Sequence, residues 1–282
     1  MAPSSVRRQL QAVVAGLPAG EVREGQVKMA ETVAAAIAGD SHAAITAGTG
    51  TGKSFGYLVP AVLSGKRLLV ATATKALQDQ LANKDLSLVA KGLHRQKVLS
   101  WAVLKGRANY LCRQRLAEMD GETQGSLEDL MATRAGGGRP RLGSLGDQVR
   151  RLVEWSGETK TGDRAELDFE PQPRAWSAVS VGSDECPGMH KCPQGGDCFT
   201  ELARAKAALA DVVVVNLHLL GAHLRSGGAV LPEFDALVID EAHELEDVLA
   251  ASLGLDVSPG RLRALAATAR AAGASAEAVE AV

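Results

Sequence analysis

The sequence predicts an α/β fold built on a parallel sheet, and three observations support this. The first is a short apolar run at 43–46, followed by a glycine-rich turn and an apolar segment, in the order strand, turn, helix. The second is a pair of apolar runs, 66–72 and 211–216, of which the valine-rich one suits a strand buried on both faces. The third is an apolar strand at 236–239 that ends in two acidic residues.

The composition is that of a globular protein with no overall basic character. The 282 residues suffice for one large or two modest domains, and 46% of them are hydrophobic. The net charge of −2 excludes a globally basic nucleic-acid-binding protein but leaves local basic surfaces open. No apolar run reaches the roughly 18 residues of a membrane span, and residues 1–11 lack the apolar core of a secretion signal.

The glycine-rich turn at 47–54 has the composition of a phosphate-binding loop. Glycine allows unusual backbone torsions and close approach of backbone N–H groups to a polyphosphate. Lys53 would place its charge on the β- and γ-phosphates, and Ser54 would supply a hydroxyl ligand to Mg²⁺. The strict pattern begins with glycine where this chain has alanine, which leaves the cradle intact. The predicted cradle consists of Ala47, Gly48, Thr49, Gly50, Thr51, Gly52, Lys53 and Ser54.

Before this turn, residues 1–20 look like a loosely held leader with a short amphipathic patch. A helix is predicted to begin near Gln26, because Val27, Ala30 and Ile37 recur at helical spacing. The Gln26 amide has both a donor and an acceptor and could bind the edge of adenine. A surface glutamine is the alternative for this residue taken alone.

The strand at 236–239 delivers two carboxylates and a histidine. Asp240, at the strand end, can hold Mg²⁺ as a second anchor after Ser54. Glu241 can polarise an attacking water. His243 lies where it can reach the γ-phosphate region, although a surface histidine at a helix start has the same sequence context.

Two further segments suggest contacts with nucleic acid. Thr74 begins a helix that continues through Leu81, and a hydroxyl there can hold a nucleic-acid phosphate or simply cap the helix. The stretch 86–117 has seven cations and no acid, with Trp101 and Tyr110 between them, which favours a phosphate-contacting surface. The cations are Lys91, Arg95, Lys97, Lys105, Arg107, Arg113 and Arg115.

The four cysteines are arranged as one isolated residue and a cluster. Cys112 is followed, far downstream, by Cys186, Cys192 and Cys198, with five residues between neighbours. Zinc favours closer pairs, although His190 could stand in for one ligand, whereas an iron–sulfur cluster accepts wider spacing. Iron–sulfur, zinc and free buried thiols all remain open from the spacing. Because a nucleotide site places the chain in the reducing cytoplasm, disulfides are not expected.

Residues 118–175 predict a mostly helical inserted segment rather than sheet. A flexible break is expected at 136–140, where three glycines precede Arg139 and Pro140. A short helix is predicted at 148–155.

Taken together, these motifs resemble those of one family. In chain order they are the glycine-rich turn, segment 72–81, segment 105–112, the three-cysteine segment, segment 213–220 and the acidic box 240–243. This order resembles DinG-type DNA helicases, the bacterial relatives of XPD within helicase superfamily two. The segment Lys-Gly-Arg-Ala-Asn-Tyr-Leu-Cys at 105–112 is similar to the part of that family that carries the first cluster ligand. The resemblance begins near residue 23 and continues to the end.

The resemblance implies a fold and a division into domains. A RecA-like P-loop motor domain with a parallel sheet would be formed by residues 1–104 and 206–247, the second part carrying the DEAH box. A mostly helical iron–sulfur insertion would occupy 105–205. Residues 248–282 would begin a second, helical insertion, the arch.

The resemblance also implies roles for individual residues. Arg23 and Gln26 would recognise adenine, and Lys53 and Ser54 would bind the phosphates and Mg²⁺ of ATP. The catalytic set would be Lys53, Asp240, Glu241 and His243, in which the aspartate holds Mg²⁺, the glutamate activates water and the histidine couples hydrolysis to movement. The ligands of a [4Fe–4S] cluster would be Cys112, Cys186, Cys192 and Cys198.

The implied activity is ATP-dependent unwinding of DNA in the 5′ to 3′ direction, in repair or replication. The implied partners are single-stranded DNA and forked or tailed duplexes, bound by a monomer with no membrane partner. Nothing matches the family's second motor domain or arginine finger, so we expect an N-terminal or truncated portion that alone binds ATP poorly and does not unwind duplex. The alternative is a nucleic-acid-binding or redox-sensing iron–sulfur or zinc protein with a vestigial ATP site.

Overall fold

The computed structural model describes residues 3–17, 20–48, 50–93, 98–119, 144–254, 262, 265–266 and 268–270. Within these residues one four-stranded sheet forms, in the order β2–β3–β1–β4, and every pairing is parallel. The strands are β1 (Leu68–Thr72), β2 (Trp101–Val103), β3 (Val212–Asn216) and β4 (Ala236–Ile239). This confirms the predicted α/β class with a parallel sheet.

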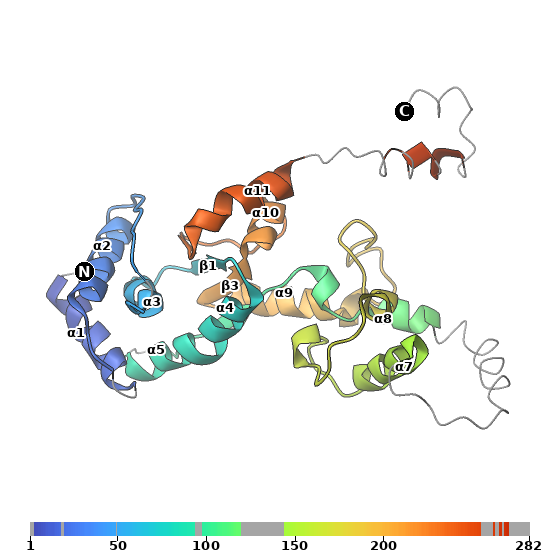
Figure 1. Cartoon of the computed structure of the whole chain (residues 1–282), viewed down its shortest axis with the longest axis horizontal. Coiled ribbons are helices and arrows are strands. Elements are labelled where there is room, and N and C mark those ends of the chain that lie inside the picture. Colours follow the sequence, from blue (N-terminus) through green and yellow to red (C-terminus); the bar gives the residue numbers. More distant parts are fainter. Residues whose placement is uncertain are drawn as a thin grey trace.

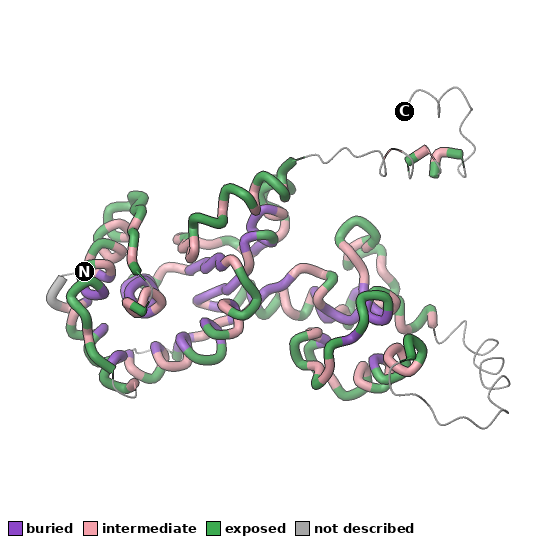
Figure 2. The backbone as a smooth tube through the Cα atoms, viewed as in Figure 1, coloured by how far each residue is buried: buried purple, intermediate pink, exposed green. Residues whose placement is uncertain are grey.

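The two central strands are buried on both faces, as their composition predicts. Leu68 pairs with Val212 and Thr72 with Asn216, so β1 and β3 run in full register. All five residues of β1 are buried, and side chains alternate between the two faces of the sheet. Figure 2 shows the buried residues concentrated in this sheet and in the helices beside it.

Four helices pack on one face of the sheet. They are α1 (Pro3–Ala15), α2 (Glu24–Ala38), α3 (Lys53–Leu63) and α5 (Leu86–Gly92). The expectation of a loosely held leader is wrong, because Val6, Leu10 and Val13 of α1 are buried in this core. These residues recur at helical spacing and form one apolar stripe, which stabilises the helix against its neighbours.

The opposite face is covered by helices from the second half of the chain. They are α9 (Phe199–Leu209), α10 (Leu217–Arg225) and α11 (Leu245–Leu253). Asn216 ends β3 and caps α10, because its side chain accepts a hydrogen bond from the Leu219 N–H. The sheet is thus the middle layer between two layers of helices (Figure 1).

A bent helical run follows β1. It consists of α4 (Lys75–Gln80), a π-helical segment (Leu81–Asp85) and then α5. Thr74 caps α4, with its side chain accepting from the Leu77 N–H at 3.2 Å, which confirms its predicted place as a helix cap. A role in holding nucleic acid stays a prediction.

The segment between β2 and β3 forms a helical layer with its own core. Besides a helix over 113–119, it holds α7 (Leu145–Ser156), α8 (Pro173–Val179) and 3₁₀ turns at Arg107–Asn109, Arg164–Glu166 and Gly195–Asp197. Its core includes Tyr110, Leu152, Trp176 and Phe199. Figure 1 shows α7 and α8 at one end of the molecule and α1 and α2 at the other, with α9 between the sheet and this layer. The predicted helix at 148–155 is confirmed, as is the helical character of the described part of 118–175, whereas the break predicted at 136–140 lies outside the described residues.

One predicted strand is absent, and one observed strand was not predicted. Residues 43–46 form no strand, and only Ile45 among them is even half-buried. Two alanines among four residues give little β-propensity and little apolar surface to bury. β4 accordingly pairs with β1 alone within the described part of the chain. Conversely, β2 was not predicted, because its three residues lie inside the basic stretch.

The arch prediction largely concerns residues outside the described ranges. α11 ends at Leu253, and a 3₁₀ turn at Ala242–Glu244 precedes it. No helix in the described part of the chain is long and apolar enough to cross a bilayer.

Candidate nucleotide site and cysteine pocket

The glycine-rich turn adopts the left-handed backbone conformations that its composition predicts. Gly50 has φ 73° and Gly52 has φ 75°, a region that side-chain-bearing residues rarely adopt. Gly52 immediately precedes α3, so Lys53 and Ser54 are that helix's first two residues and their N–H groups lie at its N-terminus. Thr49 lies outside the described residues. The rest of the turn is therefore shaped as a cradle that opens onto a helix N-terminus.

Arg23 and Gln26 brace this turn from the start of α2. The Arg23 guanidinium donates to the carbonyl oxygen of Gly50, and the Gln26 Nε2 donates to that of Gly52 at 2.9 Å. Gln26 is only 5% exposed, and its Oε1 is buried with no partner among the described atoms. Any side chain on Gly52 would collide with Gln26, since a Cβ there would lie 2.3 Å from Nε2. The two residues predicted to bind adenine thus lie against the glycine turn.

The sheet brings the acidic residues after β4 next to this turn. Lys53 Nζ lies 2.8 Å from Glu241 Oε1, although 188 residues separate them. Asp240 accepts hydrogen bonds from the Tyr57 hydroxyl and the Glu241 N–H, both at 3.1 Å. The hydrogen bond with Glu241 is the main cause that raises the pKa of Lys53, and the same bond lowers the pKa of Glu241. Both groups are therefore charged at neutral pH.

Glu241 and His243 complete this side of the site. Glu241 has φ 55°, a left-handed conformation that is uncommon for a side-chain-bearing residue and recurs at functional sites. His243 Nδ1 lies 3.5 Å from Glu241 Oε2, and its Nε2 lies 3.3 Å from Glu244 Oε1. Its side chain is 70% exposed, so it is free to meet a ligand or another part of a larger protein.

Asp85 also belongs to this site, and the sequence analysis missed it. It is buried at the end of the π-helical segment and accepts a hydrogen bond from the Gln80 amide at 3.4 Å. Burial raises the pKa of Asp85 above its ordinary value, although the nearby Ser54 hydroxyl lowers it in part. A signal was present in the sequence: Asp85 follows Leu77 and Leu81 at helical spacing, so an acid occupies the apolar stripe.

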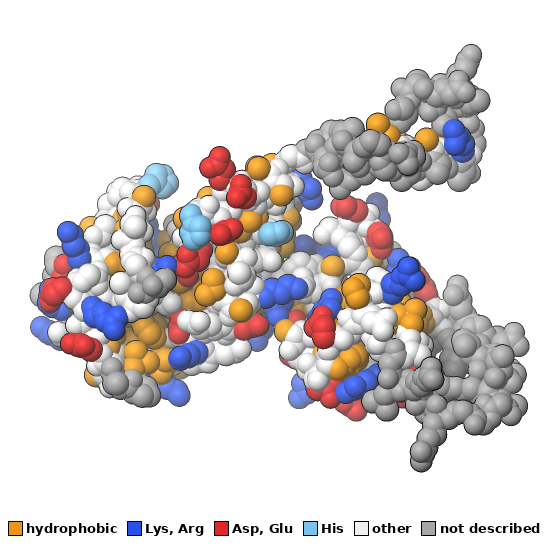
Figure 3. All heavy atoms as spheres, viewed as in Figure 1, with side chains coloured by type: hydrophobic (Ala, Val, Ile, Leu, Met, Phe, Trp, Pro, Cys, Tyr) orange, Lys and Arg blue, Asp and Glu red, His pale blue; other side chains and the backbone are white. Residues whose placement is uncertain are grey.

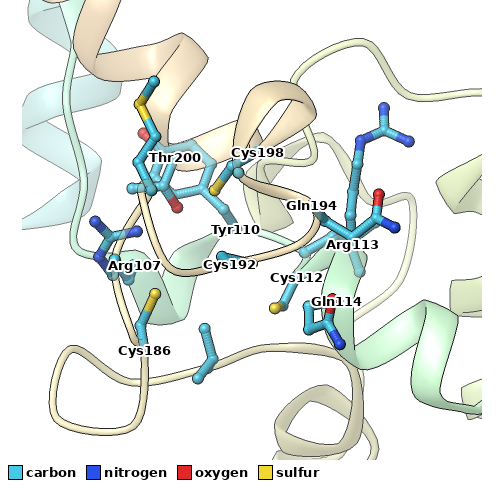
Figure 4. A pocket seen from close by; sticks show the side chains of 15 residues that line it. Arg107, Tyr110, Cys112, Arg113, Gln114, Cys186, Cys192, Gln194, Cys198 and Thr200 are labelled. Carbon is cyan, nitrogen blue, oxygen red and sulfur yellow. The ribbon is translucent and has the colours of Figure 1, made fainter.

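The four cysteines line a single pocket. The pocket is small and partly open to solvent, and Figure 4 shows their side chains arranged around it. Cys112 immediately precedes the helix at 113–119, Cys186 and Cys192 lie in the loop after α8, and Cys198 is the residue before α9. All four are half-buried and none forms a disulfide. The four predicted ligands thus lie around one pocket, and their binding of a cluster stays a prediction.

The surroundings of the pocket act on the Cys112 thiol in opposite directions. Burial raises the pKa of this thiol, although the backbone N–H groups of Arg115 and Gln114 lower it in part. The Arg107 charge acts on Cys186 and Cys198. Within the described ranges, no group of three or more His, Cys, Asp or Glu side chains is spaced to hold a single metal ion.

The basic stretch is largely occupied by internal partners, which corrects its interpretation as a phosphate-contacting surface. Lys105 is 7% exposed and pairs with Asp163 at 2.7 Å, and Arg107 forms a half-buried ion pair with Glu201. Two further arginines in the stretch also have partners: Arg113 stacks on Phe199 at 4.2 Å and donates to the Asp197 carbonyl at 2.8 Å, and Arg115 pairs with Glu185 at 3.2 Å. Arg95 and Lys97 lie outside the described residues.

The aromatic residues of this stretch are structural as well. The Trp101 indole donates to the Ala82 carbonyl at 2.9 Å, and the buried Tyr110 hydroxyl accepts from the Lys105 N–H at 3.2 Å. Figure 3 shows acidic and basic side chains interspersed on the visible face rather than gathered by sign. These contacts hold the insertion to the sheet.

Comparison with known proteins identifies relatives of the chain. No protein-family model matches it. The ATP-dependent helicase DinG of Mycobacterium tuberculosis (strain ATCC 25618 / H37Rv) is 41% identical over 252 residues, which is 85% of this chain and 37% of that protein. The ATP-dependent DNA helicase YoaA of Escherichia coli (strain K12) is 39% identical over 255 residues, 89% of this chain and 37% of that protein. The 3′-5′ exonuclease DinG of Bacillus subtilis (strain 168) is 32% identical over 243 residues, 84% of this chain and 24% of that protein.

The chain thus spans little more than a third of the length of the first two relatives. The alignments nevertheless cover most of the chain at a level of identity that indicates common descent. Over most of its length, the chain is therefore a relative of the DinG and YoaA helicases.

Proposed function

We propose that this chain is the nucleotide-binding motor lobe of an ATP-dependent DNA helicase. The observation that carries the proposal is the 2.8 Å approach of Lys53 to Glu241, with Asp240 alongside. A lysine on a glycine turn and an acid pair at a strand end are the parts that grip a triphosphate and its Mg²⁺ in P-loop motors. The names of the relatives support the same function.

The residues of the turn fit the phosphates of ATP. The N–H groups at the start of α3 and the Lys53 ammonium would bind the anionic oxygens. Phosphate and Glu241 are competing partners for the same ammonium, so nucleotide binding would draw Lys53 from the carboxylate. Glu241 would then be free to accept a proton from the attacking water.

The Mg²⁺ and adenine sites follow from neighbouring groups. Ser54 and Asp240 would hold Mg²⁺, which supplies charge neutralisation to the phosphates. Gln26 Oε1 is a buried acceptor that lacks a partner among the described residues, and the adenine amine is a donor of matching chemistry. Gln26 and Arg23 would therefore bind adenine. His243 would couple ATP hydrolysis to movement.

DNA is the proposed substrate. The family relationship supports single-stranded DNA and forked or tailed duplexes, movement from 5′ to 3′, a role in repair or replication, and a cytoplasmic monomer. Thr74 lies at the carboxyl end of β1, where helix-start amides and a hydroxyl can hold a backbone phosphate.

The cysteine pocket would hold a [4Fe–4S] cluster. The support for this proposal is that four thiols from separated segments line one pocket. Four cysteine thiolates are the usual ligands of such a cluster. The cluster would fasten an insertion whose own core is small. Zinc is the alternative occupant of this pocket. Metal and sulfide analysis of anaerobically purified protein would distinguish zinc from an iron–sulfur cluster.

The experiment that tests the nucleotide site is the Lys53→Ala substitution. We expect binding of a fluorescent ADP with Mg²⁺ to weaken by about tenfold or more, because the variant loses a charge-assisted contact. Lys91→Ala on α5 is the matched control, since Lys91 is exposed on the same face of the fold and should leave binding unchanged. Equal binding by the two variants would contradict the proposed site.

The same substitution separates the motor from a binding module with a vestigial ATP site. In the longer protein, DNA-stimulated ATP hydrolysis should be lost in Lys53→Ala if the lobe is a motor. Persistence of that hydrolysis would favour the alternative, in which the cysteine pocket carries the function.

A further inference from the structure

Tyr57 is a buried tyrosine of α3 whose hydroxyl has its partner in the proposed nucleotide site. The residue is only 3% exposed. A buried phenol hydroxyl usually needs a hydrogen-bond partner, and many groups in a core could supply one. Here the hydroxyl donates to the Asp240 carboxylate at 3.1 Å, although 183 residues separate the two. The ring of Tyr57 therefore belongs to the core, whereas its hydroxyl belongs to the site.

One face of α3 contacts both acids that follow β4. Lys53 and Tyr57 lie four residues apart in this helix, so their side chains share a face one turn apart. The Lys53 ammonium reaches Glu241 at 2.8 Å, and the Tyr57 hydroxyl reaches the acid before it. The acid pair is thus attached to the helix by two hydrogen bonds, one from a charged donor and one from a neutral donor.

A nucleotide would affect these two hydrogen bonds differently. The side chains of Lys53 and Glu241 are 27% and 28% exposed, so a phosphate can compete for the ammonium. The Tyr57 hydroxyl is buried and uncharged, and burial raises the pKa of Tyr57 well above its ordinary value, which keeps its proton in place. The bond to Asp240 would therefore persist when Lys53 turns to a phosphate.

The hydrogen bonds of Asp240 show what this contact can do. A carboxylate has about four lone-pair sites on its two oxygens. Tyr57 donates to Oδ2, and the Glu241 N–H donates to Oδ1 at 3.1 Å. One donor on each oxygen fixes the plane of the carboxylate and leaves lone pairs on both oxygens for a cation or its water.

We propose that Tyr57 is a positioning residue of the magnesium site. Its hydroxyl holds the Asp240 carboxylate in the orientation that receives Mg²⁺ or a water bound to it. Partners that orient a metal ligand in this way raise the affinity of the site for the metal. This inference rests on the proposed nucleotide site.

The test measures how much Mg²⁺ strengthens nucleotide binding. Fluorescent ADP is titrated into the 282-residue chain with excess Mg²⁺ and again with EDTA, and the ratio of the two Kd values is the Mg²⁺-dependent gain. Tyr57→Phe keeps the ring and removes only the hydroxyl. We expect it to reduce this gain by about tenfold, the usual effect of losing a partner that orients a metal ligand. The affinity in EDTA should stay close to that of the wild type.

Two further variants distinguish positioning from a merely structural role. Tyr110→Phe is the matched control, because Tyr110 is also 3% exposed and hydrogen-bonded through its hydroxyl, but lies in the core of the insertion. It should retain the whole gain. In an Asp240→Ala background, Tyr57→Phe should cause no further loss, because residues that act through one another are not additive.

The outcomes separate this inference from the proposed function. An unchanged gain in Tyr57→Phe, equal losses with and without Mg²⁺, or additive losses with Asp240→Ala would overturn the positioning role while nucleotide binding by the wild type stands. A wild type that binds ADP equally well in Mg²⁺ and in EDTA would overturn it too. Absence of nucleotide binding by the wild-type chain would instead contradict the proposed function, and this inference with it.

Discussion

Gly52 is where the backbone of the phosphate turn, the brace from α2 and the start of α3 meet. Its φ of 75° is one that glycine adopts freely, and the Gln26 amide occupies the space where a side chain would begin. The residue at position 52 must therefore adopt a left-handed backbone torsion, and it must also have no side chain that would meet Gln26.

Two alanine substitutions separate the torsional requirement from the steric one. Gly52→Ala should lower the free energy of unfolding by about 2 kcal/mol or more, since it adds a collision with Gln26 to the cost of a left-handed alanine. Gly65→Ala has nearly the same torsion, φ 73°, with no atom near its Cβ, and should cost only about 1 kcal/mol. Urea unfolding of both variants measures the difference. Equal losses would show that Gln26 yields and does not brace the turn.

Individual residues were predicted to different extents. Lys53 and Asp240 were placed correctly because a glycine turn and an acid at a strand end have fixed positions in a parallel sheet. The contacts of Arg23 and Gln26 with the turn itself were not predicted, because a helix position alone does not give the direction of a long side chain. Asp85 was missed although it follows Leu77 and Leu81 at helical spacing, because the spacing of a single acid does not show what it is buried against.

At the scale of elements, α1 shows how a short amphipathic stretch can be misjudged. Val6, Leu10 and Val13 share one face and are buried against the other helices of their layer. The apolar pattern is short, and whether it indicates a packed helix depends on a partner surface that the local sequence does not show. The same dependence on a partner explains the two errors in strand prediction. β2 is a three-residue strand that is stabilised by its pairing with β3, whereas the segment at 43–46 is exposed and forms no strand.

The packing of α1 leads to a prediction about stability. Leu10→Ala should lower the free energy of unfolding by about 2–5 kcal/mol, because it leaves a cavity in a fully buried site. Gln11→Ala, on the exposed side of the same helix, should change it by no more than about 0.5 kcal/mol. Denaturant titration at constant pH measures both. A Leu10→Ala variant as stable as the control would restore the interpretation of residues 1–20 as a loosely held leader.

At the scale of the whole molecule, the chain holds two centres with separate cores. The nucleotide site lies where the first sheet-facing core meets the end of β4, and the cysteine pocket lies against the core of the helical insertion. α9 belongs to both, since Phe199 packs in the insertion and Ala207 against the sheet. Cations of the basic stretch stabilise this junction through internal ion pairs. Counting cations in the sequence therefore overstated how many could contact DNA.

Separate cores predict that the metal centre can be lost while the nucleotide site persists. Cys112→Ser should abolish the broad visible absorbance of an iron–sulfur cluster in anaerobically purified protein, because serine removes one of four thiolate ligands. Binding of fluorescent ADP should remain within about twofold of the wild type, since no residue of the nucleotide site belongs to the insertion core.

His190→Ala is the control: His190 is exposed in the cysteine loop, and its substitution should leave the spectrum unchanged. Loss of bound metal in His190→Ala, with zinc and no sulfide in the wild type, would identify a zinc site with a histidine ligand. Loss of ADP binding in Cys112→Ser would show instead that the two centres form one cooperative unit joined through α9.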